Sequence, residues 1–494
     1  MAPVRRDGGG TLSVDEPIGT GVRGHGPEDG ADHGRRPVSG GGVDPDRRVL
    51  SGVRDVLFVA FFFPPLGGGG VQRSLKFVRY LPDHGWQPRV LAAEADYWMR
   101  DEALLAEVPP RTAVLRVAFG GRRLIAMGGR GGTRSRAATR FLRGLSRFFL
   151  VPDTYVGWSR RAAAVAEEEI ARHPCALLFT TSSPDSAHLL GRRVKRATGI
   201  PWVADFRDPW TGRLSYAPPT PLHHRLHFAL EGSCLREADA VVVTTPETRD
   251  DFLARHRDLD PAKFCIIPNG FDEEDFAAAF AERAAGACVG AGAWIPAEGF
   301  PVLHAGQLNL DRPLGPFLAG LRLYRERGLG AGYAGAAREA MTFLLGPCYD
   351  SHGEEVKAAG LSDAVRFLPG RTHHDAVAAM LSARVLLLLE QDSDRGRLVL
   401  PGKAFEYLRA GRPILAVVPR GGAAARFVRE TNAGIAVDPS SPTEIAEALA
   451  RLLDGEADPR RTVVSAARYE RRILTAELAR LFDAVSARGH PAPS

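Results

Sequence analysis

The sequence predicts an α/β protein with two domains, each built on a parallel β-sheet. A chain of 494 residues is too long to form a single hydrophobic core. Short apolar runs, typical of strands buried on both faces, alternate with helix-like stretches in two successive parts of the chain. The hydrophobic fraction of 45% and the charged fraction of 25% are ordinary for a globular protein.

The first series of strands begins with the apolar run Val56–Phe63, which Pro64 ends. Six further apolar runs continue it: Arg89–Ala92, Ala113–Val117, Ala176–Thr180, Trp202–Ala204, Ala240–Thr244 and Phe264–Ile267. With the helical stretches between them, these runs predict one Rossmann-like domain over residues 51–285.

The second series follows an Ala- and Gly-rich linker at residues 286–298 and predicts another Rossmann-like domain over residues 299–470. Its apolar runs are Val302–His304, Met341–Leu345, Val365–Leu368, Val385–Leu389, Pro413–Val418 and Gly434–Val437. A helical stretch at Val463–Leu481 comes last, and residues 471–494 are assigned to a C-terminal helix and tail. Ligands of such sheets bind beyond the carboxyl ends of the strands, so two facing domains predict a central cleft.

Residues 1–50 are rich in Gly, Pro, Asp and Arg and predict a disordered extension. The chain has no apolar leader and no run of about 18 apolar residues, so we expect a cytoplasmic protein. Its net charge of +6 is mild, and we expect no nucleic-acid partner. The five cysteines form no CxxC pair and predict free thiols.

A glycine loop, which includes Gly68, Gly69 and Gly70, lies between the first predicted strand and a helix. Glycine permits close approach of a ligand, and a helix N-terminus offers free N–H groups to an anion. A plain tight turn explains the glycines equally well. A dinucleotide fingerprint requires a further glycine where Arg73 stands, which argues against NAD, although Glu94 could still act as a ribose-binding acid.

Charged residues follow two strands of the first predicted domain. Asp205, Arg207 and Asp208 come at the end of one strand, where active sites form, and Asp205 and Arg207 are candidate catalytic residues. A structural ion pair that caps a turn is an equal alternative. His188 follows another strand and could act on a hydroxyl or a phosphate, although a lone His is more often a packed core residue.

The second predicted domain offers three candidates for donor binding. Lys403 and Glu406 lie one turn apart on a helix that Pro401 begins, so they share a face. The lysine could bind a diphosphate, and the glutamate could accept hydrogen bonds from ribose hydroxyls. The alternative is a surface ion pair with no role in binding. Arg312 follows the first strand and could neutralise a diphosphate, or it could be a solvated loop residue.

Residues 121–150 contain eight arginines and no acid, together with several apolar residues. Such a segment can lie on an anionic membrane surface from the cytoplasmic side, and a solvated basic helix is the alternative. DxD-like triplets at residues 258–260 and 392–394 are common by chance, and we expect neither to bind a metal. No cofactor other than a donor substrate is expected.

Six segments together resemble the retaining glycosyltransferases of family 4, which have the GT-B fold. They are FFFPPLGGGGVQRSLKFVRYLPDHGW, PWVADFRDPW, IIPNGFDEEDF, VLHAGQL, PGKAFEYLRAGRPILAVVP and ETNAGIAVDP. The resemblance covers roughly residues 55–485. It implies that Lys403 and Arg312 bind the diphosphate of a nucleotide-sugar donor, that Glu406 binds its ribose, and that the glycine loop approaches the donor or the acceptor.

The resemblance also implies transfer with retention and without a metal, to a saccharide, lipid-linked or small-molecule acceptor that Asp205 or His188 orients. One residue departs from the family pattern, because many members carry a glutamate where this chain has Leu398. The nearest upstream acid that ends a strand is Glu390. A nucleotide-sugar epimerase and an inactive, transferase-like binding subunit therefore remain as alternatives, with a NAD-dependent oxidoreductase less well supported.

Overall fold

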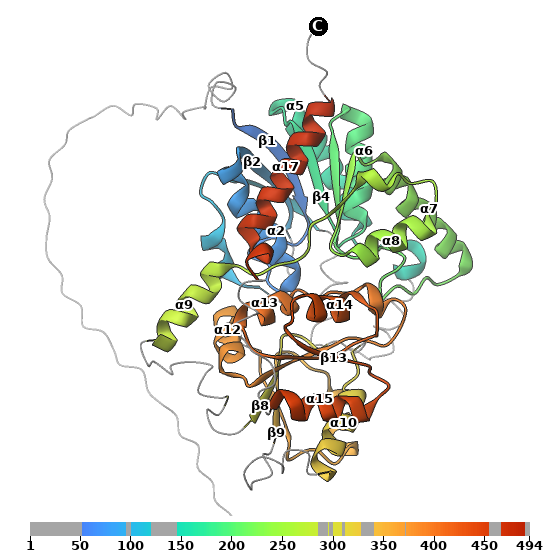
Figure 1. Cartoon of the computed structure of the whole chain (residues 1–494). Coiled ribbons are helices and arrows are strands. Elements are labelled where there is room, and N and C mark those ends of the chain that lie inside the picture. The colour runs from blue at the N-terminus through green and yellow to red at the C-terminus, as the bar shows by residue number, and fades with distance from the viewer. Residues whose placement is uncertain are drawn as a thin grey trace, which may run out of the picture. The chain divides into compact units, whose positions relative to one another are not determined.

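The computed structural model describes most of the chain and places it in helices and parallel strands (Figure 1). The described residues are 52–94, 100–119, 146–284, 295, 300–308, 312–327, 340–370, 372–453 and 466–489. The predicted extension at residues 1–50 and all but one residue of the predicted linker at 286–298 lie outside them.

The first sheet is entirely parallel and has the strand order β3-β2-β1-β4-β5-β6-β7. Its strands are β1 (Arg54–Ala60), β2 (Trp86–Glu94), β3 (Ala113–Ala118), β4 (Leu177–Thr181), β5 (Trp202–Phe206), β6 (Ala240–Val243) and β7 (Phe264–Ile266). In the middle of the sheet Phe58 of β1 is in register with Phe179 of β4, and both side chains are fully buried. Burial on both faces explains why these strands are continuous apolar runs rather than alternating ones.

The second sheet is also parallel, in the order β10-β9-β8-β11-β12-β13. Its strands are β8 (Phe300–Ala305), β9 (Ala340–Leu345), β10 (Val365–Leu368), β11 (Val385–Leu389), β12 (Ile414–Val417) and β13 (Gly434–Val437). Every strand that the sequence predicted is present, and the prediction of two Rossmann-like sheets is confirmed.

Helices connect the strands of both sheets, as expected for parallel pairing. Around the first sheet they are α2 (Gly69–Tyr80), α5 (Val156–Arg172), α6 (Ser186–Thr198), α7 (Pro221–Glu237) and α8 (Pro246–Arg255), with 3₁₀ turns η1 (Leu81–His84), η2 (Glu102–Glu107) and η3 (Pro261–Lys263). Helix α9 (Glu273–Ala284) follows β7 in sequence but packs against α12 and the core of the second sheet. Around the second they are α10 (Gly315–Glu326), α11 (Asp350–Ala358), α12 (His373–Ser382), α13 (Lys403–Ala410), α14 (Ala423–Glu430) and α15 (Pro442–Leu453), with η5 (Gly396–Leu398) and η6 (Ala467–Tyr469).

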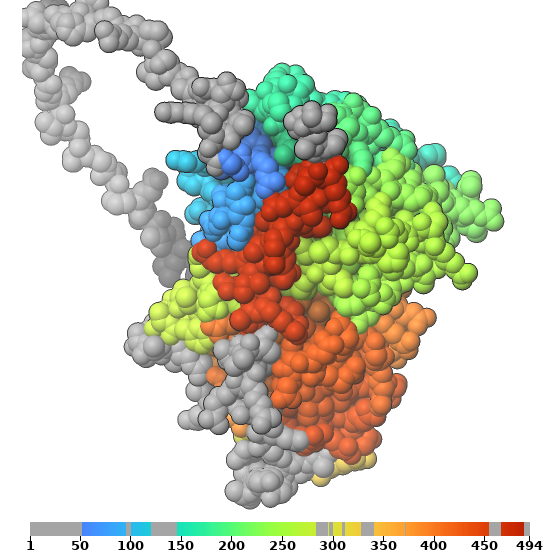
Figure 2. Space-filling model, turned by 45° about the horizontal axis from the view of Figure 1, so that its top comes forward, coloured from blue at the N-terminus to red at the C-terminus, as the bar shows by residue number. Residues whose placement is uncertain are grey.

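The last helix, α17 (Arg471–Gly489), follows the second sheet in sequence but packs on the first. Leu474, Leu478 and Phe482 belong to the same buried cluster as Val56 of β1 and Leu75 of α2. Figure 2 shows α17 beside the blue segments that contain β1 and α2. The sequence placed this helix at Val463–Leu481. The structure begins α17 at Arg471, after η6, and residues 463–465 of the predicted stretch lie outside the described residues.

One other detail differs from the sequence prediction, and one is confirmed. The apolar run Val56–Phe63 is longer than its strand, because Phe61 to Phe63 continue past the sheet and two of the three are fully buried beyond it. The expected free thiols are confirmed for the four cysteines that lie in the described residues, namely Cys175, Cys234, Cys265 and Cys348.

Direct contacts join elements of the two sheets. Arg426 of α14 donates two hydrogen bonds to Glu247 of α8, at 2.7 and 3.1 Å. The hydroxyl of Thr245 donates to the carbonyl oxygen of Leu398 at 3.2 Å, and Arg395 donates to the carbonyl of Tyr216 at 2.7 Å. The loop that holds Leu398 therefore contacts the first half of the chain through its backbone.

Candidate active site at the carboxyl ends of the strands

Each sheet has one position where the strand order reverses, and ligands of such sheets bind beyond the carboxyl ends of the strands at this position. In the first sheet it lies between β1 and β4, and in the second between β8 and β11. The glycine loop follows β1, Arg312 follows β8 and Glu390 follows β11. The candidates predicted from sequence therefore gather near these two positions.

Lys403 begins α13, and its ammonium Nζ lies 2.9 Å from Nε2 of His304 on β8. The other ring nitrogen of His304, Nδ1, donates to the carbonyl oxygen of Leu387 at 3.0 Å, so Nε2 accepts from Lys403. Burial and the neighbouring Lys403 charge hold the pKa of His304 well below its usual range, which keeps the imidazole neutral. Gly306, at φ 100°, leaves space for the lysine, because a Cβ there would lie 3.3 Å from Nζ.

The pKa of Lys403 is therefore unusually low for a lysine. Burial and the nearby guanidinium of Arg312 lower the pKa of Lys403 to about 7, although Glu390 and Glu406 oppose the shift. Among the described residues no carboxylate forms an ion pair with Nζ. An arriving dianion would restore the charged form and gain a strong charge-assisted contact.

Arg312 lies beside this lysine and is bound to Glu390, which is fully buried at the end of β11. Nε of Arg312 donates to Oε1 of Glu390 at 3.0 Å, and Nη2 lies 2.9 Å from the same oxygen. The Arg312 side chain is 15% exposed, whereas that of Glu390 is 0% exposed. Glu390 thus fixes the guanidinium, whose outer edge remains near solvent.

Glu406, one turn after Lys403, is paired with His373 at the start of α12. Nε2 of His373 lies 2.8 Å from Oε1 of Glu406, and Nδ1 lies 3.6 Å from Oδ2 of Asp275 on α9. Burial alone would lower the pKa of His373, but Glu406 and Asp275 raise it to about 9. His373 in turn keeps the pKa of Glu406 below its usual value despite burial. The carboxylate is thus charged and oriented before any ligand arrives.

Asp205, at the end of β5, is fully buried and fully engaged by protein groups. Arg73 of α2 donates to its two oxygens at 3.1 and 2.9 Å, and the Thr181 hydroxyl donates at 2.7 Å. Arg73 also donates to the carbonyls of Ile267 and Pro268, at 2.9 and 2.7 Å. This network ties α2 to β5 and to the end of β7, and the structure therefore places Asp205 in a structural ion pair.

Arg207 is half-buried and reaches the glycine loop, where its Nη1 donates to the carbonyl of Gly70 at 2.6 Å. It also bonds the carbonyl oxygen of Ser182 after β4. Gly69 and Gly70 are exposed, and Gly68 caps α2 at φ 96° without a side-chain hydrogen bond. Backbone and guanidinium donors thus meet at the β1/β4 position, as an anion or hydroxyl ligand requires.

His188 lies on α6 and is completely buried, so it does not reach the surface of the site. Its ring stacks on Phe206 with centroids 3.9 Å apart, and Nδ1 lies 2.9 Å from the Thr180 hydroxyl. Burial lowers the pKa of His188 to about 3. The packed-core interpretation therefore fits His188 better than direct contact with an acceptor.

Comparison with known proteins adds evidence of a different kind. Residues 68–270 match the glycosyl transferase 4-like domain, and residues 343–470 match the glycosyl transferases group 1. The chain belongs to the family 4-like glycosyltransferases. Over 234 residues it is 26% identical to a D-inositol 3-phosphate glycosyltransferase of Salinispora tropica, a match that covers 45% of each chain. The match thus spans under half the length of that relative.

Solved glycosyltransferase structures share the fold. The Anabaena protein HepE, solved in complex with UDP and glucose, is 13% identical and aligns with a TM-score of 0.56 over 87% of this chain and 100% of its own. The α,α-trehalose 6-phosphate synthase of Burkholderia multivorans is 14% identical, with a TM-score of 0.58 over 89% and 100%. At these identities the likeness establishes the fold alone, which is the GT-B fold.

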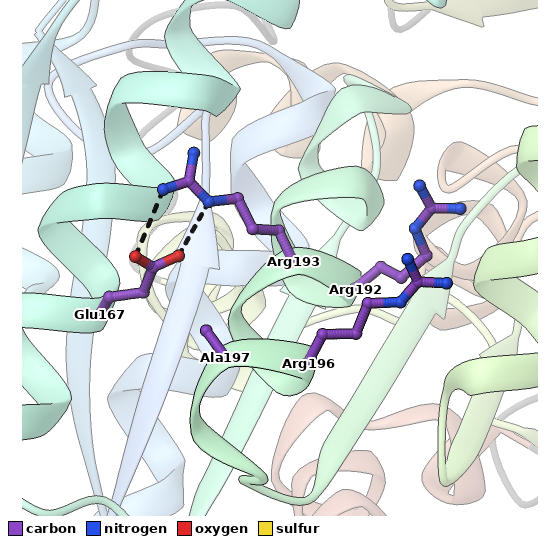
Figure 3. A pocket seen from close by; sticks show the side chains of 5 residues that line it. All are labelled: Glu167, Arg192, Arg193, Arg196 and Ala197. Atoms are coloured by element: carbon purple, nitrogen blue, oxygen red, sulfur yellow. Dashed lines mark hydrogen bonds and ion pairs between the residues drawn. The ribbon is translucent and has the colours of Figure 1, made fainter.

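A surface pocket, whose lining side chains are drawn in Figure 3, lies on α5 and α6 and not at either reversal position. It is lined by Glu167, Arg192, Arg193, Arg196 and Ala197, at the ends of α5 and α6 that lie toward the amino ends of the strands. Its arginines already have protein partners, since Arg193 bonds Glu167 and Arg196 bonds Glu237. We therefore do not include it in the candidate active site.

Sequence reasoning missed three residues that the geometry makes important: Arg73, His304 and His373. The sequence did contain a signal for Arg73, which stands where the dinucleotide fingerprint has its third glycine. A buried arginine at that position requires an anionic partner. His304 stood within a segment already quoted for the resemblance, directly before the loop of Arg312. Nothing in the sequence linked His373 to Glu406, which lies 33 positions further along.

Proposed function

We propose that this chain transfers a sugar from a nucleotide-sugar donor to an acceptor hydroxyl, with retention at the anomeric carbon. The observation that carries the proposal is Lys403, which within the described part of the chain is held at the β8/β11 position by a neutral histidine and not by a carboxylate. Its natural counter-ion is then supplied by a ligand. A nucleoside diphosphate fits this requirement together with Arg312.

The leaving group of such a transfer is the nucleoside diphosphate, which gains negative charge as the sugar gains oxocarbenium character. Lys403 and Arg312 are fixed before the reaction, by His304 and Glu390 respectively. Preorganised cations of this kind stabilise developing charge without reorganisation. A donor phosphate oxygen would take the proton from the acceptor hydroxyl on the same face of the sugar.

Glu406 is proposed to accept hydrogen bonds from the donor ribose, because His373 keeps it ionised and oriented. The donor sugar must be held differently from that of many family members. Leu398 offers no carboxylate and uses its carbonyl to accept from Thr245, and Glu390 is occupied by Arg312. We propose that backbone groups of residues 391–399 position the sugar.

The acceptor is proposed to bind at the β1/β4 position, near Arg207 and the exposed backbone of Gly69 and Gly70. The relatives named as D-inositol 3-phosphate glycosyltransferases make a phosphorylated inositol the first acceptor to assay. Saccharide and lipid-linked acceptors follow. We propose that transfer needs no metal, which activity in excess EDTA tests directly.

A thermal-shift panel of UDP, GDP, dTDP, ADP and their sugar conjugates tests the donor site. A ligand that binds the native state raises the unfolding midpoint once its concentration exceeds its Kd. We expect one nucleotide series to stabilise the wild type, and Lys403→Met and Glu406→Ala to lose the shift. Lys357→Met, at an exposed position on α11, is the matched control.

Product analysis with the stabilising donor separates the proposed function from its alternatives. Transfer to an added acceptor, with the anomeric configuration retained by NMR, supports the proposal. An epimerised donor without acceptor would indicate an epimerase. Donor binding without any turnover would indicate a binding subunit, and the absence of all nucleotide binding would contradict the proposed site.

A further inference from the structure

Four large hydrophobic side chains that are exposed in the described part of the chain belong to one surface. Phe148 and Phe149 lie in a helical turn at residues 146–149 and are 47% and 70% exposed. Leu222 and Leu226 lie on α7 and are 71% and 45% exposed. We call these four residues the apolar patch. Such a group of solvated apolar side chains usually marks an interaction surface.

Contacts through His223 hold the two segments of the apolar patch together. Its ring centroid lies 4.7 Å from that of Phe148, which in turn lies 5.4 Å from Phe149. Nε2 of His223 donates to the carbonyl oxygen of Phe148 at 2.9 Å, while Nδ1 lies 2.7 Å from the Thr220 hydroxyl. Leu222 and Leu226, four residues apart, share one face of α7 with this histidine between them.

The surroundings of the apolar patch are basic. Arg147 and Arg225 are exposed beside it, and neither residues 146–150 nor residues 221–230 contain an acid. The sequence that leads into Phe148 continues this charge, since residues 121–145 contain seven arginines and no acid. Those 25 positions, where a basic membrane segment was predicted, lie outside the described residues.

We propose that the apolar patch, with Arg147 and Arg225, docks the protein onto an anionic lipid bilayer. Phenylalanine and leucine side chains insert at the boundary between headgroups and acyl chains, and arginines beside them bind lipid phosphates. A second copy of the chain is a poorer occupant, because a symmetric contact would place arginines against arginines. In the described part of the chain no helix is long and apolar enough to cross a membrane.

The apolar patch is connected to the acceptor side of the proposed active site. Tyr216, in the segment between β5 and α7, has its hydroxyl 3.0 Å from Nδ1 of His224. Arg395, in the loop after β11, donates to the carbonyl of Tyr216. Docking through α7 would therefore bring the segment after Arg207 close to the bilayer. If the proposed transfer is correct, this placement favours an acceptor carried by a lipid.

Vesicle co-sedimentation of the purified full chain tests the docking without any donor or acceptor. The vesicles contain phosphatidylcholine and phosphatidylglycerol at 7:3, or phosphatidylcholine alone. We expect binding to the anionic vesicles, weakened by salt, and a loss of at least about tenfold in Phe149→Asp/Leu222→Asp. The control Leu105→Asp/Phe367→Asp changes charge equally at side chains that are 42% and 40% exposed elsewhere, and should retain most of the binding.

An uncharged pair, Phe149→Ser/Leu222→Ser, separates apolar insertion from charge, and it should also bind more weakly than the wild type. Equal loss in the patch and control variants, or unchanged binding in the serine pair, would contradict the proposal. A dimer that the patch variants dissociate, with vesicle binding unaffected, would assign the surface to a second copy instead. Because no turnover is measured, failure of the proposed transferase activity would leave this result intact.

Discussion

At the carboxyl end of the first sheet, the buried guanidinium of Arg73 meets the carboxylate of Asp205, and side chains that are 1% and 0% exposed form the ion pair. At the corresponding edge of the second sheet, the ammonium of Lys403 meets a neutral imidazole. Both edges carry conspicuous charges in the sequence. The charge of Arg73 is already matched by a carboxylate, whereas Lys403 has a neutral partner and can pair with an anionic ligand.

This difference shows how a structural ion pair and a binding cation are distinguished. A buried pair with matched charges and additional hydrogen bonds has no capacity left for a ligand, and removing one partner leaves the other uncompensated. A buried cation with a neutral partner has a lowered pKa. An anionic ligand raises that pKa again, because it stabilises the charged form. From the sequence, Asp205 was a candidate catalytic residue and Lys403 a candidate donor-binding residue, each with an ion pair as the alternative. Their partners in the structure distinguish the two.

The largest expected effect is on stability, from Asp205→Asn. The change leaves the Arg73 charge buried without its counter-ion, so the free energy of unfolding should fall by about 3–5 kcal/mol. Urea denaturation measures it, with exposed Asp208→Asn as the control, for which we expect a change below about 0.5 kcal/mol. A stable Asp205→Asn protein that has lost turnover would instead make Asp205 catalytic.

The second effect is on activity, from Lys403→Met. Removing a cation that contacts the leaving diphosphate should lower kcat/KM by about 10²-fold. Thermal stability without ligand should stay the same or rise, because the substitution removes a buried amine that has no carboxylate partner among the described residues. Steady-state kinetics of the wild type, Lys403→Met and the Lys357→Met control measure the change. Unaltered turnover in Lys403→Met would show that the diphosphate binds elsewhere.

A smaller effect concerns His373, whose pKa is raised to about 9 from an ordinary value of 6.5. A raised pKa in the folded state contributes stability that is fully present below pH 6.5 and is lost as pH rises through about 9. Because the side chain is 31% exposed, we expect only about 1–2 kcal/mol between wild type and His373→Gln at pH 6.

Denaturation at pH 6 and pH 9.5 measures this difference, and the adjacent His374→Gln, whose side chain is 40% exposed, serves as the control. The difference in the free energy of unfolding between wild type and His373→Gln should be smaller at pH 9.5 than at pH 6. A gap of constant size would mean that His373 stabilises the fold through packing and not through its charge pair with Glu406.

The fold was largely predictable from sequence because strands buried on both faces must be apolar along their whole length. Every apolar run became a strand, from β1 to β13. The start of α17 was misplaced because residues before Arg471 are equally compatible with a helix and with the 3₁₀ turn that forms. Its packing against β1 and α2 is a long-range contact that local patterns do not contain.

The sequence predicted the candidate site only as a set of charged residues that follow strands. Lys403, Glu406 and Arg312 could be named from spacing and resemblance, and the structure places them around the β8/β11 position. Their charge states could not be predicted, because His304 and His373 contact Lys403 and Glu406 from positions 99 and 33 residues away in the sequence. For His188, burial favours the packed-core interpretation, and the burial of a single helix residue is not visible in its neighbours along the chain.

The central claim is that the Lys403 amine has a lowered pKa in the free protein and becomes protonated when a diphosphate binds. Isothermal titration calorimetry at pH 8, in two buffers of different ionisation enthalpy, counts the protons taken up with the nucleoside diphosphate that the thermal panel selects. With a Lys403 pKa of about 7 in the free protein, we expect uptake approaching one proton, absent in Lys403→Met, and affinity that falls by up to about tenfold per pH unit above 7. Tight binding without proton uptake, or equal uptake in both proteins, would contradict the account.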